Sequence, residues 1–206
     1  MALWQVYLSG LVADPEPCVR RKGRLQPLYL AQSVLDGSCG LLAVLQAAMV
    51  LGGFSRAQVL ALPTSPHPML RRLWKQAQAT YFHGATATQM IAYVDAFAPQ
   101  LTARIIRPRR ISHIGPLVQT ILDAGAVPIA GFTGRGFSHW ALVIGMERNA
   151  QGRPLALLLL DPSVAEPLFG LFNARMELGA GAVQYATQDS LSPVRLCELV
   201  IVQHGT

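Results

Sequence analysis

The decisive stretch of this sequence reads Gln32-Ser33-Val34-Leu35-Asp36-Gly37-Ser38-Cys39-Gly40-Leu41-Leu42-Ala43-Val44-Leu45. Residues 39–52 are apolar on nearly every side, which predicts a buried helix that begins at Cys39. A thiol at a helix N-terminus faces unpaired backbone N–H groups and the positive end of the helix dipole. Both favour the thiolate, which is the nucleophilic form of cysteine. We therefore interpret Cys39 as a candidate catalytic nucleophile.

The alternative for any free cysteine is a small buried hydrophobe. Cys18 lies in a polar segment with prolines, and Cys197 lies inside an alternating apolar run. Neither has glycines around it or a helix start after it, so the structural interpretation fits these two better than Cys39. Three cysteines at irregular spacing do not form a disulfide framework, which predicts a reducing, cytoplasmic setting. No Cys/His pair has zinc-ligand spacing, and we expect neither a metal site nor a cofactor.

Two later segments place polar groups at the edges of apolar runs. They read Gly136-Phe137-Ser138-His139-Trp140-Ala141-Leu142-Val143-Ile144-Gly145 and Leu157-Leu158-Leu159-Leu160-Asp161-Pro162. The turn-like residues 149–152 between them predict an antiparallel hairpin. Its expected register sets His139 opposite Asp161, with Cβ atoms ~4.5–5.5 Å apart. Taken singly, His139 also fits a satisfied core histidine, and Asp161 also fits an Asp-Pro turn that ends a strand.

A histidine and a carboxylate in this arrangement would complete a site for nucleophilic catalysis. The carboxylate would hold one imidazole nitrogen and leave the other nitrogen to take the Cys39 proton. Acyl transfer at a cysteine also needs hydrogen-bond donors where the oxyanion forms. The backbone N–H of Cys39 can be one donor, and the side-chain amide of Gln32 can be the second. The alternative for Gln32 is an ordinary exposed loop residue.

Periodicity predicts mostly helices in the first half of the chain and strands in the second. Helices are expected at 39–52, 69–79, about 86–98 and 115–124, and strands at 4–8, 101–106, 127–132, 139–146, 155–160 and 194–202. Such segregation predicts an α+β fold with separate layers rather than a doubly wound sheet. The length predicts a single domain over residues 1–206, with a helical half at about 30–125 and a sheet half at about 126–206.

These motifs together resemble those of papain-like cysteine peptidases, and among them the bacterial C39-like branch, which includes the bacteriocin-leader peptidases. The resemblance covers residues 30–53 and 127–163. It implies a papain-like fold, with Cys39 as nucleophile, His139 as general base and acid, Asp161 as the orienting group and Gln32 as the oxyanion donor. Cys39 comes seven positions after Gln32, where six positions are expected in most relatives.

Charge and hydropathy limit the partners and the location. The net charge is +6, and basic residues gather in Arg20-Arg21-Lys22-Gly23-Arg24 and between Arg104 and Arg110. Neither cluster contains interleaved aromatics, so nucleic acid is not favoured; solvated surface is expected, with an acidic partner surface as the alternative. No apolar run approaches the ~18 residues of a membrane span. The first residues lack the features of a signal peptide, although export by a signal-free route stays open.

Three functions agree with these features. The leading one is a thiol hydrolase that cleaves a peptide or isopeptide bond in a peptide or protein substrate. The second is an acyltransferase of transglutaminase-like or phytochelatin-synthase-like type, which would use the same site. The third is a papain-like module that binds a peptide without turning it over. An intact set of Cys39, His139 and Asp161 argues against the third.

Overall fold

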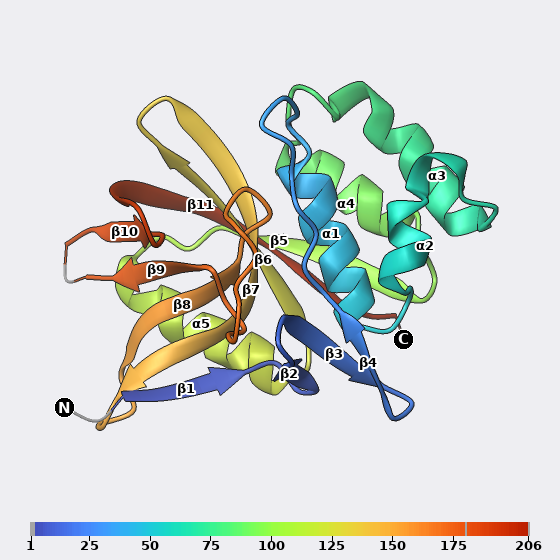
Figure 1. Cartoon of the computed structure of the whole chain (residues 1–206). Helices are drawn as coiled ribbons and strands as arrows, with labels where there is room; N and C mark the ends of the chain where they lie inside the picture. The colour runs from blue at the N-terminus through green and yellow to red at the C-terminus, as the bar shows by residue number, and fades with distance from the viewer. Residues whose placement is uncertain (1–2, 180, 206) are drawn as a thin grey trace.

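The computed structural model describes residues 3–179 and 181–205, and a helical part packs against an antiparallel sheet (Figure 1). The α-helices of this part of the chain are α1 (Cys39–Val50), α2 (Arg56–Leu60), α3 (Pro68–Ala77), α4 (Ala87–Asp95) and α5 (Ile111–Asp123). Short 3-10 helices follow α2 at Leu62–Thr64 and α3 at Gln78–Thr80. None of the described helices combines the length and the apolar character needed to cross a membrane.

The main sheet has eight strands, all paired antiparallel. They are β1 (Leu3–Tyr7), β5 (Leu101–Ile106), β6 (Val127–Gly134), β7 (Phe137–Asn149), β8 (Pro154–Leu160), β9 (Ala174–Leu178), β10 (Val183–Ala186) and β11 (Leu191–His204). Six of them close into a ring in the order β7-β6-β11-β10-β9-β8, because β8 also pairs with β7. The long strand β7 pairs with β1 beyond the part that pairs with β6, and the long strand β11 pairs with β5 beyond the part that pairs with β10.

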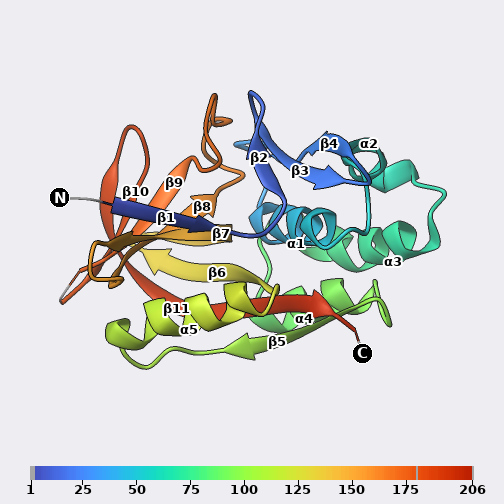
Figure 2. The same cartoon turned by 90° about the horizontal axis from the view of Figure 1, so that it is seen from below.

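The predicted combination of helices and an antiparallel sheet is found, but within the predicted helical half at about 30–125, strand β5 joins the main sheet and helix α5 packs on it. Strands β1 and β5 come from the first half of the chain and join the main sheet. Helix α5 packs on β6, β8 and β9, and Figure 2 shows it against the sheet, away from α2 and α3. A separate three-stranded sheet of β2 (Leu11–Ala13), β3 (Pro17–Arg21) and β4 (Arg24–Pro27) was not predicted. Sequence order alone does not say which edge of a sheet a distant strand will join.

Helix α1 occupies the centre of the molecule. Its residues are apolar on nearly every side, with Gln46 as the buried polar exception, because α1 packs on α4 as well as on β6 and β7. The helix ends where Arg21 of β3 donates a hydrogen bond to the Val50 carbonyl oxygen. Its first residue is Cys39, as the apolar pattern predicts. The packing therefore holds the N-terminus of α1 beside strand β7.

Trp140 of β7 connects this strand to the helical part. Its indole Nε1 donates to the Ala85 carbonyl oxygen at 2.7 Å, and its ring lies over Gly131 on β6. A Cβ atom at position 131 would be 2.4 Å from Trp140 Cζ3, which is far inside van der Waals contact. Only glycine fits there while the indole keeps its place.

Gly131→Ala is therefore expected to force the indole away from Ala85 and to lower the free energy of unfolding by ~1–3 kcal/mol. Urea unfolding measures the loss. Gly181→Ala is the matched control, because a Cβ there meets no atom within 4 Å. Equal stability of the two variants would contradict the proposed packing role of Gly131.

Candidate active site

Cys39 is the first residue of α1 and is held by the turn before it. Asp36 organises this turn, because its Oδ1 accepts hydrogen bonds from the backbone N–H and the hydroxyl of Ser38, at 2.9 and 2.5 Å. Ser38 precedes the helix but makes no side-chain cap bond to it. The Cys39 side chain is buried, and its Sγ lies 4.0 Å from the Gly37 carbonyl oxygen. The thiol is thus fixed at the end of the helix where the dipole is positive.

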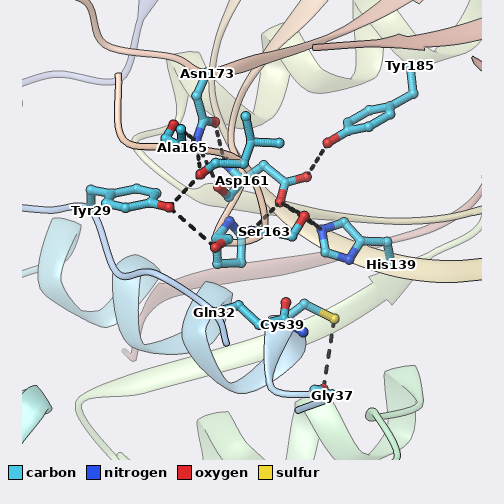
Figure 3. A network of polar contacts seen from close by, with 12 residues as sticks. Tyr29, Gln32, Gly37, Cys39, His139, Asp161, Ser163, Ala165, Asn173 and Tyr185 are labelled. Carbon is cyan, nitrogen blue, oxygen red and sulfur yellow. Dashed lines mark hydrogen bonds and ion pairs between the residues drawn. The ribbon is translucent and has the colours of Figure 1, made fainter. Parts of the chain in front are cut away.

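His139 on β7 lies between Cys39 and Asp161. Its Nε2 is 2.8 Å from Asp161 Oδ1, and Figure 3 shows the other ring nitrogen turned toward the side where Cys39 lies. Burial lowers the pKa of His139, but hydrogen bonds to Asp161 and Cys39 and the negative charge of both outweigh burial and raise this pKa to about 10. The imidazole is therefore cationic at neutral pH. A cation beside a cysteine favours the thiolate.

Asp161 is fully buried and follows the last residue of β8. Its Oδ1 accepts from His139, from the Ser163 backbone N–H at 2.8 Å and from the Ser163 hydroxyl at 2.7 Å. Its Oδ2 accepts from the Tyr185 hydroxyl at 2.7 Å. Burial raises the pKa of Asp161, but the bonds and charge of His139 and the bonds from Ser163 and Tyr185 outweigh burial and hold this pKa below its usual range. Asp161 and His139 therefore form a buried ion pair.

The expected contact between His139 and Asp161 exists, but the expected pairing of these two residues directly opposite each other is wrong. Leu142 pairs with Leu160, so Asp161 comes level with Ala141 rather than with His139. His139 lies two positions along the same face, and diagonal neighbours ~7–8 Å apart remain in reach of long side chains. The register shifts by one residue on β7 between Val143 and Gly145 and by one residue on β8 between Ala156 and Pro154, so the two irregularities offset each other. The difference arises at the turn, where the Asn149 N–H donates to the Arg153 carbonyl oxygen at 3.0 Å, so the hairpin is centred on Gln151 rather than between Ala150 and Gln151.

Gln32 lies in the segment that leads into α1. Its backbone N–H donates to the Pro162 carbonyl oxygen at 2.7 Å, which ties this segment to the residue after Asp161. Its side-chain Nε2 donates to the Asp36 carbonyl oxygen at 2.6 Å, and Oε1 has no hydrogen-bond partner among the described residues. An amide nitrogen carries two N–H groups, so Nε2 keeps a second donor. The role of Gln32 as an oxyanion donor stays a prediction.

The sequence interpretation missed the residues that hold Asp161. Ser163 and Tyr185 bind the carboxylate of Asp161, and Asn173 binds its backbone. The Asn173 Oδ1 accepts from the Asp161 N–H at 2.7 Å, and the Asn173 Nδ2 donates to the Asp161 carbonyl oxygen at 2.8 Å. Tyr29 donates to the carbonyl oxygens of Pro162 and Val164 (Figure 3). The sequence Asp-Pro-Ser could have indicated the contact between Ser163 and Asp161, because short polar side chains form hydrogen bonds with groups one or two residues away. Asn173, Tyr185 and Tyr29 come from distant segments without a motif.

The two other cysteines lie in different surroundings. Cys18 is buried on β3, and burial together with the charges of Glu16 and Asp14 raises its pKa. Cys197 is half-buried on β11, where its Sγ lies 3.5 Å from Thr133 Oγ1. Over residues 3–179 and 181–205, no group of three or more His, Cys, Asp or Glu side chains is arranged to hold a metal ion.

Comparison with known proteins adds one structural similarity. No protein-family model matches the sequence, and no curated protein sequence is significantly similar to it. Among solved structures, the crystal structure of UfSP from C. elegans is similar, with a TM-score of 0.49 and 12% sequence identity. The similarity covers 98% of this chain and 34% of that chain, so this chain spans about a third of its length. A similarity of this degree assigns no family, and the functional interpretation rests on the site.

Proposed function

We propose that this chain is a papain-like thiol hydrolase that cleaves a peptide or isopeptide bond through Cys39, His139 and Asp161. The observation that carries the proposal is the buried His139–Asp161 ion pair beside a cysteine at the start of a buried helix. A nucleophile, a base and an orienting acid in contact are the signature of covalent acyl transfer. The helical part that carries Cys39 and the sheet that carries His139 also agree with the papain-like arrangement.

In the proposed reaction, the Cys39 thiolate attacks the carbonyl carbon of the scissile bond. The tetrahedral intermediate collapses as the carbon–nitrogen bond breaks, and His139 gives its proton to the departing amine. The product is a thioester between Cys39 and the acyl part of the substrate. A water molecule then attacks this thioester while His139 takes its proton, which releases a carboxylic acid and restores the imidazolium–thiolate pair. Asp161 keeps the imidazole oriented through both steps.

Gln32→Ala tests the second oxyanion donor. Removing one such donor costs ~10²–10³ in turnover, because it acts on the tetrahedral intermediate more than on the bound substrate. We expect that loss in kcat with little change in KM, measured on any peptide that the protein cleaves. Gln26→Ala, on strand β4, is the matched amide control. Wild-type turnover in Gln32→Ala would assign Gln32 to the surface loop and leave the oxyanion to backbone donors.

Hydrolysis and acyl transfer are separated by their products. The experiment incubates the reduced protein with a pool of peptides and isopeptide-linked peptides, with and without an excess of a primary amine, and weighs the products. Free carboxylic acid as the main species in both conditions supports the hydrolase. A product that carries the amine would assign the chain to the acyltransferases. Binding of a peptide without any product would leave a binding module.

Finer assignments remain proposals from the sequence. The C39-like branch rests on the motifs around Cys39, His139 and Asp161, and the cytoplasmic location rests on the unpaired cysteines. The substrate would be a peptide or a protein, as the proposed chemistry requires. The basic clusters at residues 20–24 and 104–110 remain candidate contacts for an acidic partner.

A further inference from the structure

The two oxygens of Asp161 are held by different parts of the molecule. Oδ1 accepts from His139 and twice from Ser163, which lies two residues further along the chain. Oδ2 accepts from Tyr185, which belongs to the distant strand β10. Tyr185 is therefore the group that fixes the second oxygen from outside the Asp161 segment.

Tyr185 also contacts the other half of the ion pair through an aromatic ring. Its side chain is almost buried, and its ring centroid lies 5.0 Å from that of Phe132 on β6. The Phe132 ring in turn meets His139 edge to face at 5.5 Å. Tyr185 thus donates a hydrogen bond to Asp161 through its hydroxyl, and its ring packs on Phe132, which in turn packs on His139.

A carboxylate held by one oxygen alone would be poorly oriented. The last side-chain torsion of aspartate is broad, so the carboxylate plane can turn about it at little cost. A bond to Oδ2 from a second direction fixes this plane and keeps Oδ1 pointed at the histidine. It also satisfies an oxygen that is cut off from water, and an unsatisfied buried anion is costly.

We propose that Tyr185 is a positioning residue of the site: its hydroxyl locks the Asp161 carboxylate and thereby maintains the His139–Asp161 ion pair beside Cys39. This inference rests on the proposed catalytic function of these three residues. It extends the site to β10, a strand that carries none of the sequence motifs. Ser163 shares the task on the first oxygen but cannot hold the second.

Four titratable groups face Asp161 or its partner: His139 on β7, Tyr185 on β10, Tyr29 ahead of α1, and Cys39 on α1 by way of His139. Burial and then the charge of Asp161 raise the pKa of Tyr29 to about 12 and that of Tyr185 well above its ordinary value. Both tyrosines therefore keep their protons between pH 4 and 9. A change of the pH profile in that range therefore does not come from either tyrosine.

Tyr185→Phe removes one oxygen atom and keeps the ring that packs on Phe132. The measurement is the rate of Cys39 alkylation by iodoacetamide against pH, which needs no substrate. Loss of the donor frees the carboxylate plane, so the imidazolium is held less firmly beside Cys39 and stabilises the thiolate less; the acid limb of the profile should therefore move up by about one pH unit. The rate at pH 9 should stay at the wild-type value. Tyr7→Phe, which loses a hydroxyl bond to Gln5 on β1, is the control and should keep the wild-type profile.

A second pair of variants separates positioning from mere packing. Asp161→Asn should shift the acid limb further than Tyr185→Phe does. The double variant should show the same acid limb as Asp161→Asn alone, because the carboxylate through which Tyr185 acts is gone. An unshifted profile in Tyr185→Phe, or equal added shifts in both backgrounds, would overturn the inference about Tyr185. An unshifted profile in Asp161→Asn would instead overturn the proposed function itself.

Discussion

Replacing Cys39 with alanine is expected to abolish hydrolysis while the protein stays folded. The proposed reaction passes through a thioester at this sulfur, and neither water nor a neighbouring side chain can take its place as the nucleophile. The helix should persist, because alanine is the strongest helix former and Cys39 contributes only its small side chain to the core. Product formation from the peptide pool measures the loss, and circular dichroism checks the fold.

Cys197→Ala is the matched control for this substitution. It removes a half-buried thiol from β11 and should leave hydrolysis at the wild-type level. Hydrolysis that survives in Cys39→Ala, or that disappears in Cys197→Ala while the fold is retained, would contradict the assignment of the nucleophile.

Asp161→Ala is expected to cost ~3–5 kcal/mol of stability, because it leaves His139 as a buried cation without its partner. The loss should depend on pH in a defined way. The depressed pKa of Asp161 means that its contribution is present above its ordinary value of 3.8 and is lost as the pH falls through the lower value of the folded state. The raised pKa of His139 means that its contribution is fully present below 6.5 and is lost as the pH rises through about 10.

The difference in stability between the wild type and Asp161→Ala should therefore be largest between about pH 4 and 6.5 and should shrink steadily toward pH 10. Urea unfolding at a series of pH values measures it. Asp189→Ala, which removes an exposed carboxylate beside β10, should differ little from the wild type at every pH. A difference for Asp161→Ala that grows with rising pH would show that the two groups do not form an ion pair in the folded protein.

The position of Cys39 at the start of its helix could be predicted because the information is local. A run of apolar residues on every side means a buried helix, and the glycines with Cys39 mark its start. The strand at Leu101–Ile106 was likewise bounded correctly, because its ends carry clear signals. Its pairing with β11, about a hundred residues further along the chain, could not be predicted, because periodicity does not say which strands will be neighbours.

The shell around Asp161 could not be predicted, for physical reasons that differ from residue to residue. Tyr185 sits on a four-residue strand, which is too short for periodicity to identify. Gly145 lies where β1 approaches β7 closely, so that a Cβ there would meet the Val6 carbonyl oxygen at 2.4 Å. That contact joins the N-terminal strand to β7 and exists only in the folded chain. The expected register of His139 and Asp161 failed because the turn of the hairpin runs from Asn149 to Arg153 rather than over residues 149–152.

The central claim is that Cys39 is an activated thiol, and one measurement tests it most directly. Iodoacetamide is applied to the native protein between pH 5.5 and 9, and peptide mapping gives the alkylation rate of each cysteine. Beside the cationic His139, Cys39 should already react at pH 6, at least about ten times faster than Cys18 and Cys197. Equal rates at the three cysteines, or faster alkylation of Cys18, would contradict the account.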